Sequence, residues 1–586
     1  MYKTIYAERN GTNKHKIHLW TDEGYEQIEW VNYAYKECSP ENATHEGLKK
    51  EPLYKTKNYY YNPWKRFNPT TGKDEFDPKN DKGLHFIDIK AHQKFLIEKY
   101  GTNDEISTTH RELFFDIETE MLDSLTEEGI REAPKKVTSI AWYDKQVDQW
   151  GILILDTKNQ IKHTKAKNKE IIPVKTEEEL LAKFLEKFRE IDPDILIGYN
   201  SDYFDIPYLY YRMCNVLGED WAKHLSPIGK IKISKPKNPK YKGKTFQEVK
   251  IIGVESLDYM RLHKKYSWAD EPSWKLDAIG EKYAGINKIE YEGSLDRLFE
   301  EDIHKFIQYN FVDVEILVKL DEKLEYLALT KNLSHKGKHN YSEVYANTNT
   351  QDGAISAYLL SINIVPPNID HENVKEEGYA GGYLFCPKAG IYNYMFDEDL
   401  TSLYPSIIMS LNIGKETLMG WIIDADDRNS RLGLNDLKKM DPKKELTLRR
   451  HDGLRLTFPV STIIRNIEAF KYTISANGTM FSTKKQSVLS TILAKWFEER
   501  VYYKDEMKKA YKAGNKELGA SFHMKQYTFK ILLNSLYGAT ALPSFRYGNV
   551  ALSKAITLTG QRIIQESALC ANRHMNKVIR GELELC

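Results

Sequence analysis

The run Asp399-Leu-Thr-Ser-Leu-Tyr-Pro-Ser-Ile407 constrains the possible fold most strongly. It places a carboxylate at the end of an apolar strand and follows it with a tightly turned segment that is rich in hydroxyl groups. A carboxylate in this position can hold a divalent cation, while backbone amides of the turn contact phosphate oxygens. The run therefore predicts a site for a metal-bound triphosphate.

Two long helical patterns follow, from Val488 to Tyr511 and from Glu517 to Leu536. The short polar linker Lys512-Ala-Gly-Asn-Lys516 joins them, so we expect an antiparallel helical hairpin. We also expect Gly538 to end the second helix, because glycine readily adopts the left-handed conformation of a helix cap.

Each helix of the predicted hairpin carries a polar pair with i,i+4 spacing. Arg500 and Lys504 form this pair on the first helix, and Lys530 and Asn534 form it on the second. Residues with this spacing share one helix face, so both pairs can face a single gap. Three cations there suit a triphosphate, since arginine binds phosphate oxygens in a bidentate way and lysine supplies a mobile charge. A basic, solvated surface is the alternative interpretation of either pair alone.

Acidic residues upstream predict a second cation site. Asp116 and Glu118 are two residues apart on a short apolar strand, which turns both carboxylates to one face. Asp205 ends a polar turn after another apolar strand, and Tyr309 and Asp313 lie one helical turn apart. Each fragment alone is common on ordinary strand ends and helix surfaces. Their order within one α/β segment favours a shared site for hard divalent cations.

The chain of 586 residues is too long for one hydrophobic core, so we expect roughly three to five domains. No apolar run approaches the roughly 20 residues that cross a bilayer, and the N-terminus lacks a secretory signal, so we expect a cytoplasmic protein without a membrane partner. Five scattered cysteines predict neither a disulfide framework nor a zinc site. A net charge of +1 carries no polyanion signal, and basic stretches at 49–65 and 230–244 fit DNA contacts and solvated loops equally well.

The run from Asp399 and the run Lys530-Ile-Leu-Leu-Asn-Ser-Leu-Tyr-Gly538 together resemble the two nucleotide-binding motifs of family B DNA polymerases. The three acidic segments resemble, in order, the three motifs of proofreading 3′→5′ exonucleases. The resemblance extends from about Leu113 to Asn576. The leading domain resembles tailed-phage replicative polymerases more loosely.

This resemblance implies a multidomain α/β fold. It contains an RNase H-like 3′→5′ exonuclease domain, a partial polymerase palm of α+β type and fingers made by the antiparallel helical hairpin, after a β-rich N-terminal domain. The implied boundaries are 1–108 for the N-terminal domain with part of 336–380, 109–335 for the exonuclease domain, 381–470 for the first part of the palm, 471–534 for the fingers and 535–586 for a second, incomplete part of the palm. We expect strands after Tyr379-Ala-Gly-Gly382 and a crossing or linker at about 328–348.

For hydrolysis, the resemblance implies two Mg²⁺ ions, for which Mn²⁺ can substitute, that activate a water and stabilise the leaving 3′ oxygen. The implied metal ligands are Asp116, Glu118, Asp205 and Asp313. Tyr309 would orient the attacking water. Asn200 and Phe204 would position the terminal nucleotide.

For nucleotide addition, the resemblance implies the same two-metal chemistry. Asp399 would bind metal, and the backbone carbonyl of Leu400 would add a ligand. The amides of Ser402 and Leu403 would contact the triphosphate, and Tyr404 would be the steric gate that excludes a 2′-hydroxyl group.

Further roles follow from the same resemblance. Arg500, Lys504, Lys530 and Asn534 would bind the nucleotide, and Lys530 would also protonate the leaving pyrophosphate. Tyr537 would stack near the templating pair. The residues expected beside the DNA backbone are Tyr379, Gly381, Gly382 and Gly538. A plain hairpin turn explains the paired glycines equally well.

The family's second metal motif, an acidic Asp-Thr-Asp hairpin, does not occur between the predicted helix Ala555 to Asn576 and Cys586, and neither does a thumb. We therefore hypothesise an N-terminal subunit of a split DNA-directed DNA polymerase, completed by a C-terminal partner chain. A gene split, an intein position with Cys586 as a splicing residue, and a truncation remain open. Other expected partners are primer-template DNA, deoxynucleoside triphosphates and a sliding clamp. DNA-primed and protein-primed initiation both remain open.

Two other functions are compatible with these motifs. A stand-alone 3′→5′ exonuclease with a polymerase-like relic predicts weak single-strand cleavage by the lone chain, sensitive to Asp116→Ala. A non-catalytic DNA-binding scaffold predicts magnesium-independent binding without turnover.

Overall fold

The computed structural model describes the chain apart from residue 12 and the segments 58–65, 69–72, 76–82, 123–125, 235–247, 268–269, 370–380, 387, 392–397, 424–430 and 581–586. Tyr379, Cys586 and much of both basic stretches therefore lie outside the described residues. The chain divides into unit 1, Met1–Asn32 with Lys90–Ala346, and unit 2, Tyr33–Ile89 with Asn347–Cys586. Among the described helices, none has both the length and the apolar character of a membrane span.

Unit 1 is built around a seven-stranded sheet with the strand order β13-β14-β12-β11-β10-β15-β18. The strands are β10 (Glu112–Thr119), β11 (Val137–Asp144), β12 (Gln149–Leu155), β13 (Thr164–Ala166), β14 (Lys169–Val174), β15 (Ile195–Gly198) and β18 (Glu255–Asp258). β10 pairs with β15 in parallel, and β15 pairs with β18 in parallel. Because parallel strands end at the same edge, residues that follow β10, β15 and β18 are brought close together.

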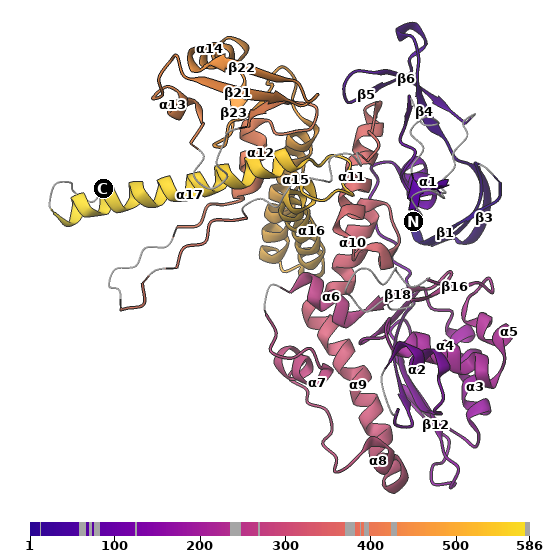
Figure 1. The fold of residues 1–586 in the computed structure, drawn as a ribbon. Coiled ribbons are helices and arrows are strands. Elements are labelled where there is room, and N and C mark those ends of the chain that lie inside the picture. The colour runs from indigo at the N-terminus through magenta and orange to yellow at the C-terminus, as the bar shows by residue number, and fades with distance from the viewer. Residues whose placement is uncertain are drawn as a thin grey trace. The chain divides into compact units, whose positions relative to one another are not determined.

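Helices cover both faces of this sheet (Figure 1). The helices of unit 1 are α1 (Ala91–Tyr100), α2 (Glu127–Glu132), α3 (Glu177–Ile191), α4 (Asp205–Val216), α5 (Glu219–Ala222), α6 (Tyr259–Tyr266), α7 (Leu276–Ile279), α8 (Leu295–Glu301), α9 (Ile303–Leu324) and α10 (Tyr326–Gly337). Leu113, Phe115 and Ile117 of β10 share a buried core with α3 and α4. Side chains alternate along a strand, so Asp116 and Glu118 point to the opposite face, against which α9 packs.

The remaining strands of unit 1 form small sheets, a three-stranded one of β1 (Tyr2–Arg9), β2 (Lys14–Thr21) and β3 (Gly24–Val31) and the pair β16 (Ile231–Ile233) and β17 (Val249–Ile251). Helix α3 begins at a capping threonine, since Thr176 accepts a hydrogen bond of 3.2 Å from the amide of Glu179.

The stretch 328–348, predicted to be a crossing or linker, contains the boundary between the two units after Ala346. It is not an irregular connection, because helix α10 and a short 3₁₀ turn at Tyr341–Glu343 occupy most of it. A left-handed residue, Glu325, separates α10 from α9. Leu329 and Leu333 lie in the core together with polar neighbours such as His335. Polar composition misled the prediction, since these buried polar groups have hydrogen-bond partners that the sequence does not reveal.

A buried group of histidines surrounds Tyr341 in unit 1. The Tyr341 hydroxyl lies 2.7 Å from Nε2 of His110 and 2.9 Å from Nε2 of His335. Burial lowers the pKa of His110 to about 3. The charges that also act on it are those of Lys331 and Lys3, which lower its pKa further, and of Glu112 and Asp22, which raise it. His110 is therefore neutral in the folded protein across the physiological range.

We expect the stability difference between the unsubstituted chain and the His110→Gln variant to shrink by about 2 kcal/mol between pH 7.5 and pH 5. The pKa of His110 in the folded chain lies below the value of roughly 6.5 in the unfolded chain. Only the unfolded chain therefore gains a proton at His110 in this window, and the stability decreases as the pH decreases. Urea denaturation of both chains across this range measures the difference. His163→Gln, which changes a histidine that is 58% exposed, is the control. A difference independent of pH would contradict the neutral state of His110.

Unit 2 contains two five-stranded sheets, with the orders β19-β5-β6-β4-β9 and β22-β21-β20-β24-β23, and a small pair. Its strands are β4 (Ala34–Glu37), β5 (His45–Gly47), β6 (Pro52–Thr56), β7 (Arg66–Asn68), β8 (Lys73–Glu75), β9 (Leu84–His85), β19 (Ile364–Val365), β20 (Leu418–Ile422), β21 (Glu445–Arg450), β22 (Arg455–Pro459), β23 (Thr473–Ile474) and β24 (Thr479–Phe481). Its helices are α11 (Asn347–Ser361), α12 (Leu403–Leu411), α13 (Leu434–Leu437), α14 (Val460–Phe470), α15 (Val488–Lys512), α16 (Lys516–Thr540) and α17 (Val550–Ile579).

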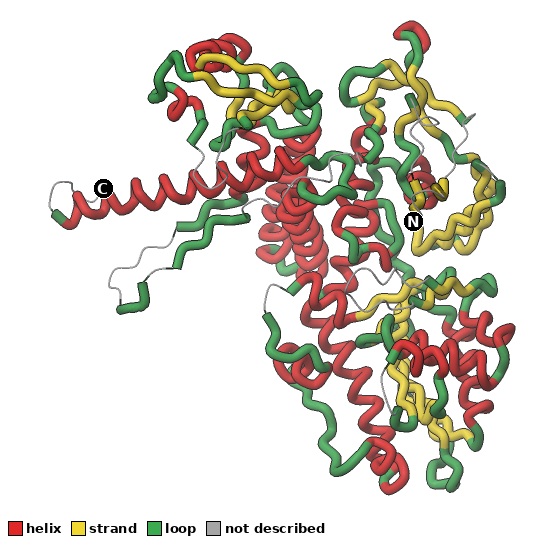
Figure 2. The backbone as a smooth tube through the Cα atoms, in the orientation of Figure 1, coloured by secondary structure: helices red, strands yellow, loops and turns green. Residues whose placement is uncertain are grey.

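The predicted helical hairpin is confirmed, since α15 and α16 pack along each other in opposite directions (Figure 2). The predicted end of the second helix is wrong. Helix α16 continues to Thr540, and Gly538 lies inside it without a left-handed backbone. Leu536, Ala539 and Thr540 are buried, so packing stabilises a last turn that glycine alone would weaken.

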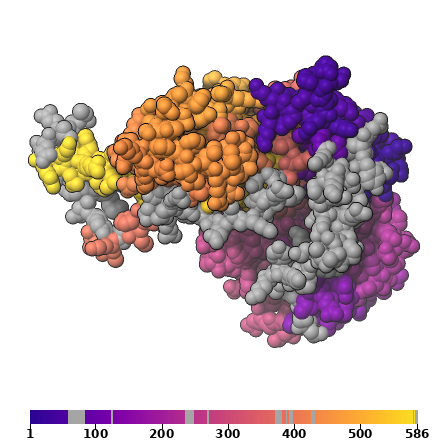
Figure 3. Space-filling model, turned by 45° about the horizontal axis from the view of Figure 1, so that its top comes forward, coloured from indigo at the N-terminus to yellow at the C-terminus, as the bar shows by residue number. Residues whose placement is uncertain are grey.

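Residues 418–481 form a small module in which β20, β21 and β22 pack against α13 and α14 through Leu437, Leu446 and Ile463. Figure 3 shows it in orange, and the yellow end of α17, mostly exposed from 568 to 577, reaches the periphery of the unit. The strands expected after Gly382 are absent from the described residues between 381 and 402.

Candidate metal centre and nucleotide-binding site

Three of the predicted carboxylates converge in unit 1. Asp116 and Glu118 come from β10 and Asp313 comes from α9, and one ligand oxygen of each lies within 4.8 Å of the others. Oxygen donors at this spacing suit a hard divalent cation such as Mg²⁺ or Ca²⁺. The sequence spacing alone did not show that β10 and α9 meet here.

Asp205 lies next to this cluster, but it does not belong to the group of carboxylates whose oxygens lie within 4.8 Å of one another. It is the first residue of α4 and is 5% exposed, and its Oδ1 accepts a long hydrogen bond of 3.4 Å from the amide of Ile117 on β10. The charge of Asp313 is among the causes that raise its pKa. Asp205 is thus close enough to interact electrostatically with the cluster.

Burial and mutual repulsion raise the pKa values of these carboxyl groups. Burial is the largest cause for Asp116, followed by the charges of Glu118 and Asp313, and its pKa lies well above the ordinary value. Burial and the charges of Asp313 and Asp205 raise the pKa of Glu118 to about 8, and burial raises that of Asp205 to about 7. Like charges in a desolvated site repel each other until protons or cations neutralise them. The donor set therefore fits divalent cations chemically.

Neighbouring side chains orient the cluster. Asn310 on α9 donates a hydrogen bond of 2.7 Å to Oδ2 of Asp116 and accepts one of 2.8 Å from Ser139 on β11. This chain of hydrogen bonds restricts the orientation of the Asp116 carboxylate. Groups that orient metal ligands in this way commonly affect metal affinity.

Lys288 is a functional candidate that the sequence analysis missed. Its Nζ donates to Oδ2 of Asp313 at 2.6 Å and to the hydroxyl of Tyr309 at 3.1 Å. Burial opposes its charge, but the carboxylates of Asp313 and Asp116 raise its pKa overall. It lies outside regular secondary structure, between α7 and α8, so no periodicity indicated its direction.

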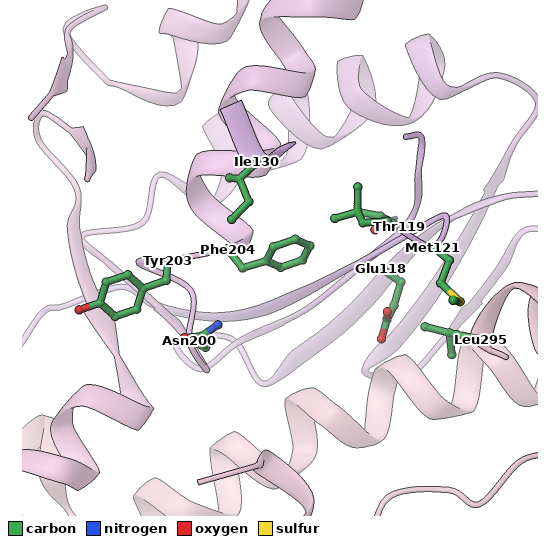
Figure 4. A pocket seen from close by; sticks show the side chains of 9 residues that line it. Glu118, Thr119, Met121, Ile130, Asn200, Tyr203, Phe204 and Leu295 are labelled. Atoms are coloured by element: carbon green, nitrogen blue, oxygen red, sulfur yellow. The ribbon is translucent and has the colours of Figure 1, made fainter. Parts of the chain in front are cut away.

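A cavity of about 450 Å³ opens beside the cluster. Glu118 connects it to the acidic residues, and Asn200, Tyr203 and Phe204 form another part of its wall (Figure 4). The other lining residues are Thr119, Met121, Leu122, Ile130 and Leu295. An apolar and aromatic wall next to an acidic centre suits a nucleotide whose base stacks while its phosphate reaches the metals.

In unit 2, the predicted nucleotide-binding residues lie on three helices. Leu403 and Tyr404 open α12, and Ser402 precedes it in a left-handed conformation. Arg500 and Lys504 lie on α15, while Lys530, Asn534 and Tyr537 lie on α16. Both helices of the hairpin pack against α12. The strand expected before Asp399 falls on residues 392–397, outside the described residues.

Asp399 is exposed, and in the described part of the chain it forms no ion pair with Arg500, Lys504 or Lys530. Helices α15 and α16, which carry these three cations, pack against α12. Among the described residues, however, no ion pair joins their side chains to Asp399. Their joint role in nucleotide binding stays a prediction.

Tyr404 has close neighbours from other elements. Its ring centroid lies 4.3 Å from that of Tyr537, and the Tyr537 hydroxyl lies 3.3 Å from Oγ1 of Thr557 on α17. A Cβ atom added to Gly560 would lie 2.9 Å from the Tyr404 ring, and one added to Gly382 would lie 3.4 Å from its hydroxyl. The packing therefore restricts the position of Tyr404.

Comparison with known proteins identifies the class. The profile of DNA polymerase family B matches residues 348–585, and the profile of the exonuclease domain of DNA polymerase family B matches residues 71–279. The chain belongs to DNA polymerase family B.

Individual relatives include phage and archaeal enzymes. The chain is 30% identical over 437 residues to the DNA-directed DNA polymerase of Escherichia phage RB69, a match covering 70% of this chain and 47% of the relative. It is 29% identical over 428 residues to that of Enterobacteria phage T4, with the same coverage, and 28% identical over 342 residues to the DNA polymerase of Pyrococcus glycovorans, covering 56% of this chain and 40% of the relative. The chain spans about half the length of the phage relatives.

Proposed function

We propose that this chain removes nucleotides from DNA 3′ ends in unit 1 and binds a deoxynucleoside triphosphate for DNA synthesis in unit 2. The observation that carries the first activity is the convergence of Asp116, Glu118 and Asp313 beside the cavity walled by Asn200 and Phe204. A phosphodiester bound in this cavity would have its base near the aromatic wall and its phosphate near the carboxylates.

The metals expected here are two Mg²⁺ ions, which would stabilise the charge that develops on the phosphate and on the leaving 3′ oxygen. Asp116, Glu118 and Asp313, with Asp205 beside them, would hold these ions. Other side chains of the chain would bind the substrate and orient the water. Phe204 and Asn200 would bind the terminal nucleoside, and the Tyr309 hydroxyl would orient the attacking water.

Lys288 has two roles in this proposal. It donates to the Tyr309 hydroxyl, which leaves an oxygen lone pair of Tyr309 available to accept a hydrogen bond from water. Its positive charge also offsets part of the repulsion among the carboxylates. Both roles require a cation in this position.

We expect Lys288→Met to lower the rate of 3′-nucleotide removal roughly 10- to 100-fold, because an orienting group beside a metal ligand is lost. Steady-state hydrolysis of a labelled single-stranded oligonucleotide measures this effect. Lys282→Met is a matched control, since Lys282 is 48% exposed and pairs with Glu271 in the same part of the chain. Equal rates for the two variants would show that Lys288 has no part in the mechanism.

The exonuclease proposal is tested directly with the purified chain and a 5′-labelled single-stranded oligonucleotide. We expect stepwise shortening from the 3′ end with Mg²⁺ or Mn²⁺ and none with EDTA. Magnesium-independent DNA binding without any shortening would favour the scaffold function and overturn the proposal.

For synthesis, the proposal includes a C-terminal partner chain with further carboxylates and a thumb. Asp399 is exposed, and two divalent cations need several carboxylate ligands to offset their repulsion. Primer extension by this chain, mixed with a chain homologous to the C-terminal half of the phage relatives, tests this step. Strong extension by the lone chain would contradict the need for a partner.

DNA, deoxynucleoside triphosphates and a sliding clamp complete the proposed partners. The similarity to two phage polymerases supports the cytoplasm of an infected host cell as the proposed place of action.

A further inference from the structure

Asp258 is a buried carboxylate that neither the sequence motifs nor the metal cluster includes. It ends β18, and its side chain is 0% exposed. Its Oδ1 accepts hydrogen bonds from the amides of Met260 and Arg261 at 3.0 and 3.3 Å, which caps α6. The same oxygen accepts a third bond of 3.0 Å from the amide of Asn200. This third bond reaches the turn that follows β15 and has no part in capping the helix.

The bond to Asn200 fixes an unusual turn. Asn200 has a φ of 62°, in the left-handed region that residues other than glycine seldom adopt. Its carbonyl then accepts from the amides of Tyr203 and Phe204 at 3.0 and 3.1 Å, and α4 begins at the next residue, Asp205. One backbone conformation thus sets the direction of Asn200, of Phe204 and of the first residue of α4.

A second contact holds the middle of the same turn. Asp202 is buried and forms an ion pair with Arg261 in the first turn of α6. It also accepts a hydrogen bond of 2.6 Å from the hydroxyl of Ser256. The Arg261 guanidinium also lies 3.8 Å from the ring centroid of Tyr345 and 5.6 Å from that of Tyr203. The segment that follows β15 is therefore fastened to β18 and α6 at both Asn200 and Asp202.

We propose that Asp258 is a positioning residue for the 3′-terminal nucleotide, acting through its hydrogen bond to the Asn200 amide. This bond holds the turn 200–204 so that Asn200 and Phe204 line the cavity of Figure 4 at a fixed distance from Asp205. The inference rests on the proposed exonuclease function. It requires a hydrogen-bond acceptor at this position, since all three bonds to Oδ1 come from backbone amides.

The test compares two substitutions. Asp258→Asn keeps an Oδ1 acceptor, whereas Asp258→Ala removes it. We expect Asp258→Ala to lower kcat for 3′-nucleotide removal roughly 10- to 100-fold, because a displaced substrate-binding turn loses alignment. Asp258→Asn should stay within about threefold of the unsubstituted chain, and the Mg²⁺ concentration for half-maximal rate should change in neither variant. Equal damage by both substitutions, or none by Asp258→Ala, would overturn the inference.

Thr176→Ala controls for simple loss of a helix cap. Thr176 caps α3 in the same unit, so this variant is expected to unfold at lower temperature while its kcat stays unchanged. If Thr176→Ala lowers kcat as much as Asp258→Ala does, destabilisation explains both results and the positioning role is wrong.

A binding measurement separates this inference from the function on which it rests. A single-stranded oligonucleotide with 2-aminopurine at its 3′ end is titrated with each variant in EDTA, so that nothing is cleaved. We expect the fluorescence change of the terminal base to be retained by Asp258→Asn and lost by Asp258→Ala. If the unsubstituted chain neither changes this fluorescence nor cleaves DNA with Mg²⁺, the exonuclease function itself fails. If it does both and Asp258→Ala matches it, only the positioning role fails.

Discussion

Asp116→Asn is expected to lower the rate of 3′-nucleotide removal by at least about 1,000-fold. A metal ion contributes several kcal/mol of transition-state stabilisation in hydrolysis, and about 4 kcal/mol corresponds to this factor. Asp116 supplies one of the three oxygens that converge within 4.8 Å, so an amide in its place weakens metal binding directly. Hydrolysis of single-stranded DNA in saturating Mg²⁺ measures the loss.

The same variant is expected to unfold at a higher temperature than the unsubstituted chain in EDTA at pH 8. Burial together with the charges of Glu118 and Asp313 raises the pKa of Asp116, so its ionised form is unfavourable in the folded protein. An asparagine removes this charge and still accepts the hydrogen bond from Asn310. Glu322→Gln, which changes a carboxylate of α9 that is 57% exposed, should alter neither quantity. Lower stability combined with normal hydrolysis would refute the metal site.

Arg546→Ala is expected to destabilise unit 2 by about 3–5 kcal/mol, because it leaves buried carboxylates without their cation. Arg546 is 1% exposed and forms an ion pair with Asp352, to which its Nη2 also donates at 2.8 Å. Its Nη1 donates at 2.7 Å to both Asp88 and the carbonyl of Pro367. One guanidinium therefore joins segments that lie more than 450 positions apart in sequence.

Chemical denaturation monitored by circular dichroism measures this loss. Arg450→Ala is the matched control, since Arg450 pairs with Asp452 at 2.9 Å while its side chain is 48% exposed, and such surface pairs contribute about 0–1 kcal/mol. A loss of less than about 1 kcal/mol for Arg546→Ala would mean that water or other groups replace the guanidinium.

Local patterns were sufficient to predict many elements. A short apolar run predicted the strand that carries Asp116 and Glu118, and the i,i+4 spacing of Tyr309 and Asp313 predicted one helix face. The hairpin of α15 and α16 was predicted because long apolar periodicity and a short polar linker leave few alternatives. The motifs also indicated family B, which the profile matches support.

The errors occurred where tertiary packing outweighs local preference. Gly538 remains helical because its neighbours are buried. Helix α10 forms in a polar stretch because Leu329 and Leu333 are buried, and because His335 and Thr330 have hydrogen-bond partners in the core. Roles that depend on an unseen ligand, such as those of Asp399, Lys530 and Gly382, stay predictions for the same reason. Sequence gives each residue's chemistry, whereas its partners come from folding.

The sequence by itself determined which chemical groups are present and which short elements carry them, because periodicity, capping and turn preferences act over a few residues. Only the tertiary structure decided that Asp313 reaches Asp116, that Lys288 reaches Tyr309 and that Asp258 holds Asn200. Each of these contacts joins segments that are distant in sequence and come from different elements of the fold. Local preferences do not encode such distances, since the burial of the whole core fixes them together.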